Sequence, residues 1–143
     1  MNIMLKGTFA DSLSLLRGVY EANKFDFSFM TAFADENPQS FFIIFDVAVV
    51  IPEGHLLATK YVAQFESDVA ITEEQRNQLP VFKINAPAIA YPFLRSYVAT
   101  ILLNSGLSPI MLPTINFVDL AKQHEIPASS WNHKLNPNIY FYS

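Results

Sequence analysis

Cysteine is absent from the sequence, which excludes disulfide bonds, thiolate nucleophiles and cysteine-based zinc sites. A protein without cysteine fits a reducing compartment, and we therefore expect a cytoplasmic location. Glycine is also scarce, and Gly7, Gly18, Gly54 and Gly106 are too far apart to form a phosphate-binding loop. The G-x-S-x-G motif of serine hydrolases is missing as well, so neither of these enzyme motifs is present.

Charged residues are also few in this sequence. Charged residues make up 15% of the 143 residues, against roughly 25% in typical soluble domains, while hydrophobic residues reach 51%. The nine lysines and arginines are scattered and the formal net charge is −4, so the sequence predicts no nucleic-acid binding. One small domain cannot easily bury that much apolar surface. We therefore predict self-association, an exposed apolar groove, or both.

The sequence gives no sign of a secretory signal or a membrane span. Its first residues, MNIMLKGTF, lack a basic lead and a long apolar run. Residues 96–118 carry no charge and are long enough to cross a bilayer, but an Asn-Ser-Gly triplet and two prolines interrupt them. We predict no membrane insertion.

Histidine and the acidic residues form no obvious catalytic or metal site. His55, His124 and His133 lie in predicted turns or in the tail, and no H-x-x-x-H pair is present. Asp46, in an apolar strand, is the one carboxylate whose pKa burial could raise, although such a residue is more often structural. The sequence therefore assigns no catalytic residue, metal or cofactor and predicts a non-enzymatic protein. An enzyme is kept as an alternative of another class.

Three segments alternate with a period of two and predict β-strands. They are Phe25–Phe33, Phe41–Ile51 and Leu56–Glu66, joined by short polar turns, which favours an antiparallel meander. Both faces of the second segment are apolar, so we expect it to be central in the sheet. A fourth strand is predicted from residues 81–85 or from the segment around Ile110.

One longer helix is predicted to begin near Tyr91 or Pro92 and to run to Asn104. Gly106 provides the stop signal. Apolar residues occupy more than one side of this helix, so we expect it to pack both on its own sheet and on another subunit. The residues predicted to meet the other subunit are Tyr97, Val98, Ile101 and Leu102.

Shorter elements are predicted elsewhere. Asp11–Asn23 reads as a short helix, and Ile71–Leu79 as one or two helical turns headed by a threonine. Val118–His124 is predicted to be a second short helix, opened by Asn116. The tail ends in residues 139–142, Ile-Tyr-Phe-Tyr, which predicts an added strand or an aromatic anchor.

The segment Leu107–Phe117 is apolar but cannot be regular. Pro109 and Pro113 exclude a regular helix and disfavour a central strand. Loops usually run over the surface, so this one either lies beneath another element or offers its side chains to a partner. Its apolar residues are Ile110, Met111, Leu112 and Ile115.

The order and spacing of several blocks resemble the carboxy-terminal half of the bacterial export chaperone SecB. The similarity covers about Phe65 to Ala121. The blocks are Asn85-Ala86-Pro87, Tyr91-Pro92-Phe93-Leu94-Arg95, Gly106-Leu107, Pro109-Ile110-Met111-Leu112-Pro113 and Ile115-Asn116-Phe117.

This resemblance implies one α+β domain over residues 1–143, in which an antiparallel four-stranded sheet carries a long helix and a shorter C-terminal helix on one face. It implies a homotetramer built as a dimer of dimers. It also implies an ATP-independent holdase that binds unfolded polypeptides in hydrophobic grooves. For Phe41, Phe45 and Phe117 an ordinary core position is an equally good interpretation. The implied client-binding residues are Phe41, Ile43, Phe45, Ile110, Leu112, Ile115, Phe117 and Leu120.

Some features differ from the resembled family. Its export chaperones are strongly acidic, dock the export motor through carboxylates and often end in a zinc-binding tail, whereas this chain has Ala58 and Thr59 in the third strand and ends in NPNIYFYS. Holding clients is therefore better supported than delivering them to the export motor. The alternatives are a SecB-like chaperone dedicated to an antitoxin or another narrow client, a small apolar-ligand carrier, and an enzyme. A closed cavity inside one subunit would favour the carrier.

Overall fold

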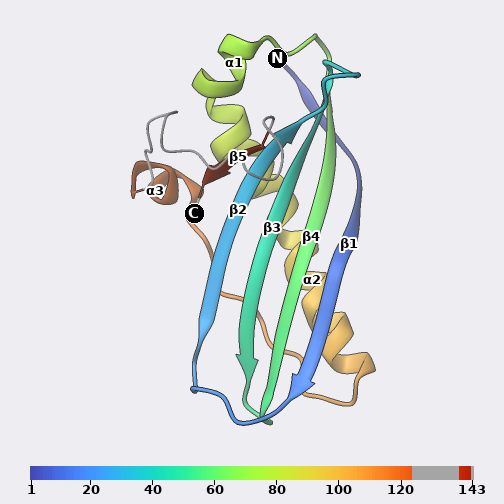
Figure 1. Cartoon of the computed structure of the whole chain (residues 1–143), viewed down its shortest axis with the longest axis vertical. Coiled ribbons are helices and arrows are strands. Elements are labelled where there is room, and N and C mark those ends of the chain that lie inside the picture. The colour runs from blue at the N-terminus through green and yellow to red at the C-terminus, as the bar shows by residue number, and fades with distance from the viewer. Residues whose placement is uncertain (124–138, 143) are drawn as a thin grey trace.

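A computed structural model describes residues 1–123 and 139–142. Its strands form one antiparallel sheet in the order β1-β4-β3-β2-β5, with α2 along one face (Figure 1). The strands are β1 (Ile3–Arg17), β2 (Phe25–Phe33), β3 (Ser40–Ile51), β4 (His55–Ser67) and β5 (Ile139–Tyr142). The helices are α1 (Glu73–Gln78), the π-helical turn η1 (Val81–Asn85), α2 (Ala86–Asn104) and α3 (Phe117–Gln123).

The predicted meander is confirmed. β2 pairs with β3 from Phe25↔Val49 to Phe33↔Phe41, and β3 pairs with β4 along its full length. Alternating phenylalanines fix this register, because a slip of one residue would turn the apolar set of a strand away from the helix. The α+β class, with four long antiparallel strands and helices on one face, is also confirmed.

The fourth long strand is β1, so the predictions of a strand at residues 81–85 or around Ile110 were wrong. The predicted helix at Asp11–Asn23 was wrong too, because β1 pairs with β4 from Ile3↔Ser67 to Arg17↔His55. Two register shifts interrupt this ladder, and such bulges break the period of two in the sequence. Pairing with β4 decides the conformation where local propensity does not.

The core lies between the inner face of the sheet and α2. The rings of Phe41 and Phe65 stack with centroids 5.2 Å apart, and Phe82 of η1 meets Phe41 edge-on at 4.9 Å. Leu94, Val98 and Leu102 of α2 are all fully buried. Each such side chain contributes about 1.5–3 kcal/mol by leaving water. The aromatic residues that predicted strands therefore also hold the helix on the sheet.

The start of α2 differs from the prediction. The helix begins at Ala86, Pro87 occupies its first turn, and Pro92 lies inside the helix. The sequence offered two prolines suited to a first turn, and the prediction chose the wrong one. The preceding turn η1 is fixed to the sheet, since the hydroxyl of Thr31 donates to the carbonyl of Phe82 at 3.0 Å.

The predicted stop of α2 at Gly106 is correct. Gly106 has a positive φ of 79°, and the amide of Leu107 donates to the carbonyl of Leu102 at 2.9 Å. The amide of Gly106 reaches Leu103 at 3.2 Å, which completes a Schellman-type end. Glycine is required here because other residues are strained in the left-handed region.

The other short elements agree with the sequence. Thr72 opens α1 with a capping box, in which its hydroxyl and the side chain of Gln75 each accept the other's amide. Asn116 opens α3, because its Oδ1 accepts the amides of Val118 and Asp119 at 3.1 Å each. The added strand at the tail is β5, beside β2. His124 and His133 lie outside the described residues.

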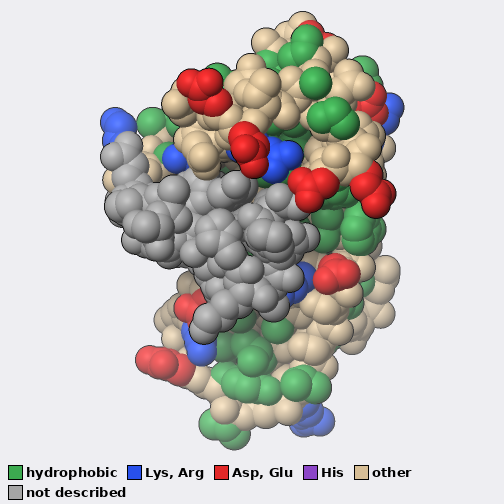
Figure 2. Space-filling model, turned by 45° about the horizontal axis from the view of Figure 1, so that its top comes forward, with side chains coloured by type: hydrophobic (Ala, Val, Ile, Leu, Met, Phe, Trp, Pro, Cys, Tyr) green, Lys and Arg blue, Asp and Glu red, His purple; other side chains and the backbone are tan. Residues whose placement is uncertain are grey.

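The helical run Val81–Asn104 is long and apolar enough to span a membrane, with a mean hydropathy of 1.3 over 18 of its residues. In the folded chain, 39% of these residues are buried. Core helices pass the same test, and the inner side of this helix packs on the sheet. The surface is also partly apolar, as the green hydrophobic side chains in Figure 2 show. Most of the acidic side chains visible in that view lie towards the end of the molecule that carries α1.

A candidate peptide-binding groove

The crossover segment, residues 107–116, connects the end of α2 to α3 behind the sheet (Figure 1). Three contacts hold it. The amide of Ser108 donates to the carboxylate of Glu53 at 2.8 Å, the hydroxyl of Tyr91 donates to the carbonyl of Pro113, and Leu112 is buried in the core. Met111, between these contacts, is 80% exposed. The segment is therefore fixed near its start and again at residues 112 and 113, while it presents an apolar side chain to solvent between these points.

Tyr91 anchors the crossover segment to the core. Its ring meets Phe27 edge-on at 5.5 Å and Phe117 at 5.7 Å. Burial raises the pKa of Tyr91 to about 12, and the nearby charge of Arg95 opposes that rise. The hydroxyl therefore keeps its proton at neutral pH and remains the donor to Pro113.

Glu53 holds the other end of the segment from the turn between β3 and β4. The hydrogen bond from the Ser108 amide lowers the pKa of Glu53 below its usual value, and the side chain is fully exposed. Glu53 is therefore a carboxylate at neutral pH and accepts that hydrogen bond as a charged group.

A groove of about 410 Å³ lies between the outer side of α2 and the crossover segment. Its lining is apolar apart from a serine and one charged residue, Arg95. Loop and helix both contribute, so the groove depends on the contacts that hold the segment in place. The lining residues are Pro92, Arg95, Ser96 and Ala99 of α2 and Pro109, Ile110 and Met111 of the crossover segment.

Arg95 is the charged residue of this lining, and its surroundings are mainly apolar and aromatic. Within residues 1–122 its side chain forms no salt bridge, and its Nε is buried without a hydrogen-bond partner. Its Cζ lies 5.9 Å from the centroid of the Tyr91 ring. An aromatic face, and not a carboxylate, is therefore the neighbour of this guanidinium.

The predicted client-binding residues separate into two groups. Phe41, Ile43 and Phe45 lie on the inner face of β3 and are fully buried beneath α2, and Leu112 and Phe117 are buried as well. This places all five in the core, with almost no surface for a ligand. The half-buried members, which lie on the crossover segment and α3, are Ile110, Ile115 and Leu120.

Sequence reasoning missed part of the groove. Met111 is 80% exposed in this lining, yet the predicted client-binding residues do not include it. Pro92, Ser96 and Ala99 follow the spacing of one helix side and lie within the predicted helix, but no pattern in the sequence places the crossover segment beside that side. Apolar type alone was a poor guide, because it does not tell which way a side chain points.

The residues predicted to meet another subunit also divide. Val98 and Leu102 face the sheet and have no exposed surface. Tyr97 and Ile101 are half-buried, and the Tyr97 ring stacks on Tyr61 of β4 with centroids 4.8 Å apart. The large hydrophobic residues that α2 leaves exposed are Ile89, Phe93 and Leu103.

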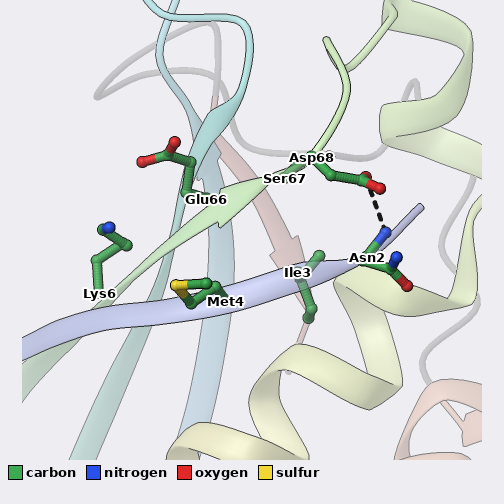
Figure 3. A pocket seen from close by; sticks show the side chains of 7 residues that line it. All are labelled: Asn2, Ile3, Met4, Lys6, Glu66, Ser67 and Asp68. Carbon is green, nitrogen blue, oxygen red and sulfur yellow. Dashed lines mark hydrogen bonds between the residues drawn. The ribbon is translucent and has the colours of Figure 1, made fainter.

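A second hollow, of about 210 Å³, lies where the ends of β1 and β4 meet (Figure 3). The backbone amide of Asn2 donates to Asp68 at 2.9 Å, and Lys6, Met4 and Glu66 project beside it. Lys6 and Glu66 carry opposite charges, and the described residues contain no group of His, Cys, Asp and Glu suited to a metal. This hollow ties down the first residues and offers less apolar lining than the groove.

An antiparallel sheet with one long helix behind it, and a proline-containing crossover that leads to a second helix, defines an α+β fold class that solved structures share. The SecB-like chaperone of Mycobacterium tuberculosis, solved with a ChAD peptide from the HigA1 antitoxin, matches with a TM-score of 0.61 at 13% identity, over 80% of this chain and 88% of that one. A Streptococcus agalactiae protein of unknown function matches with a TM-score of 0.52 at 10% identity, over 80% and 98%.

The sequence profile of the SecB family, described as preprotein translocase subunit SecB, matches residues 33–127, and the chain belongs to this family. The protein-export protein SecB of Nitrobacter winogradskyi is 40% identical over 50 residues, which are 35% of this chain and 31% of that protein. The one from Rhodopseudomonas palustris is 31% identical over 64 residues, 45% and 40% of the two chains. The aligned part thus spans about a third to two fifths of these curated relatives.

Proposed function

We propose that this protein, acting as one domain over residues 1–143, is an ATP-independent holdase that binds unfolded polypeptides in the cytoplasm. The observation that carries the proposal is the exposed Met111 on a crossover segment that three contacts hold beside an apolar groove. Membership of the SecB family supports a chaperone function, and the relatives named protein-export proteins support a place in export.

The physical basis is apolar burial without sequence reading. Covering apolar area contributes about 25 cal/mol per Å² and has no directional requirement. A groove of about 410 Å³ has room for a few side chains of an extended peptide. Ile110, Met111, Ile115 and Leu120 supply the client contacts in this proposal, and the fully buried Phe41, Ile43 and Phe45 support them from the core.

Self-association completes the proposal. Ile89, Phe93 and Leu103 leave an apolar stripe on α2 that one copy does not cover, and Tyr97 and Ile101 lie half-buried at its border. A second copy packed on this stripe would remove it from water, and a dimer of dimers follows the arrangement implied by the SecB resemblance.

Service to an antitoxin is the second candidate. The observation that favours it is the fold of the SecB-like chaperone of Mycobacterium tuberculosis, which was solved with an antitoxin peptide. Both candidates use the same groove and differ in the client, so one experiment on the groove tests what they share.

The test is suppression of aggregation of a chemically unfolded protein by Ile110→Asp/Met111→Asp. Two charges in the groove should abolish suppression, because a bound apolar client would bury them. Leu112 is unsuitable for this test because its burial would convert the same change into unfolding. Loss of activity should leave circular dichroism and solution mass unchanged.

The matched control is Val19→Asp/Val69→Asp, which places the same two charges on exposed positions away from the groove. This variant should protect clients as well as the wild type does. Full protection by the groove variant, or equal loss in both variants, would remove the groove from the proposal.

A further inference from the structure

The groove contains an unbalanced positive charge. Arg95 is the only charged residue among those that line it, and no other charged residue occurs from position 84 to position 118. The chain as a whole carries a net charge of −4. The local charge of the groove is therefore opposite to that of the molecule.

Among the residues that the structure describes, the Arg95 guanidinium lies near an aromatic ring and makes no ion pair. Its Cζ lies 5.9 Å from the Tyr91 ring centroid, and Tyr91 is itself fixed by its hydrogen bond to Pro113. Nε of Arg95 is buried and has no hydrogen-bond partner. A planar guanidinium held against an aromatic ring is suited to a carboxylate, which accepts two parallel hydrogen bonds from it.

The apolar lining strengthens this preference. Pro92, Ile110 and Met111 line the groove with Arg95, and their side chains contain no strong hydrogen-bond acceptor. A peptide that covers the groove would remove water from the guanidinium, which is costly unless the peptide supplies an acceptor. A neutral or basic peptide residue next to Arg95 does not offset the cost of removing water from the guanidinium, whereas an acidic residue does.

We propose that the groove selects client segments in which an aspartate or glutamate lies between apolar side chains, with its carboxylate paired to Arg95. The inference rests on the proposed function and adds a charge preference to it. The selection acts at contact distance, because the overall negative charge of the chain does not attract acidic peptides from afar.

The test measures binding of apolar peptides with blocked ends that differ at one central residue. Fluorescence anisotropy should give about tenfold tighter binding for Asp than for Asn, and the weakest binding for Lys. The preference should shrink as salt is added, since the pair is only half-buried. Because this comparison uses the wild-type protein, it does not depend on whether a variant folds.

Two variants assign the preference to the groove. Arg95→Met should bind the Asp and Asn peptides equally, because the charge that distinguishes them is gone. Arg17→Met removes the same charge from an exposed position on β1 and should retain the full preference. A preference that survives Arg95→Met, or that disappears in Arg17→Met, overturns the assignment.

Failure of the inference can be told apart from failure of the proposed function. Equal binding of Asp, Asn and Lys peptides overturns the charge preference and leaves the holdase intact. Absence of binding by any of these peptides overturns both. A neutral peptide with a free carboxyl end that binds more tightly than the blocked Asp peptide would assign Arg95 to chain ends and overturn the proposed side-chain preference.

Discussion

Both sides of α2 carry large apolar residues, but their environments differ. Leu94, Val98 and Leu102 on the inner side are fully buried, whereas Phe93 and Leu103 on the outer side are 48% and 63% exposed. Neighbours in sequence, such as Phe93 and Leu94, therefore differ sharply in burial. An apolar residue in this helix therefore indicates a surface that is favourably buried, but it does not indicate whether the sheet, another subunit or a client buries it.

Substitutions on the inner side of α2 should cause the largest loss of stability. Leu94→Ala should lower the free energy of unfolding by about 2–5 kcal/mol, because it leaves a cavity between α2 and the sheet. Urea denaturation followed by circular dichroism measures the loss. A change of less than about 0.5 kcal/mol, the size expected for an exposed position, would contradict the assignment of this side to the core.

Tyr91 connects the inner side of α2 to the crossover segment, and removing its hydroxyl should cause a moderate loss of stability. Tyr91→Phe should cost about 0.5–1.5 kcal/mol in unfolding free energy, since the carbonyl of Pro113 loses its donor. The matched control is Tyr97→Phe, because the Tyr97 hydroxyl makes no hydrogen bond within the described part of the chain. Equal losses in the two variants would argue against the anchor.

The same variant has a distinct alkaline signature. The folded pKa of Tyr91, about 12, lies above the ordinary value of 10.0, so the folded state holds this proton more tightly than the unfolded state. The wild type should therefore lose stability as pH rises from 10 towards 12. Tyr91→Phe should lack that part of the loss in a series of alkaline denaturation curves.

The outer side should show the smallest effect on folding and a clear effect on assembly. Phe93→Ser should change the unfolding free energy of an isolated subunit by only about 0.5–1 kcal/mol, because about half of the residue is already in solvent. Mass measured by light scattering should fall relative to the wild type if a second copy covers this side. An unchanged mass would leave the exposed stripe to some other partner.

The sequence predicted the meander well because its signal is local. Phe25, Phe27 and Phe29 alternate without interruption, and β2 follows that alternation. β1 was missed because register shifts near Gly7 and Ser12 break the alternation and because most of its side chains are exposed. An edge strand needs fewer apolar residues, so its sequence carries a weaker signal.

The sequence indicates the crossover segment as a candidate surface but does not give the orientation of its side chains. The uncharged crossover segment drew attention to Ile110 and Met111, and the groove lies there. Leu112 lies next to them in sequence and points into the core. Proline removes the regular period from this segment, so no pattern in the sequence indicates which of three consecutive apolar residues faces inward.

The position of β1 has a consequence for biosynthesis. Residues 3–17 leave the ribosome before any other strand, but their partner is β4, at residues 55–67, while β2 and β3 find neighbours through short turns. β1 can pair only after β4 has been synthesised. Closing the long loop between them costs more conformational entropy than forming a hairpin, so we expect this pairing to be slower. A nascent chain interrupted before residue 55 would therefore hold β1 without its partner strand, and the backbone amides and carbonyls of β1 would be open to pairing with another chain.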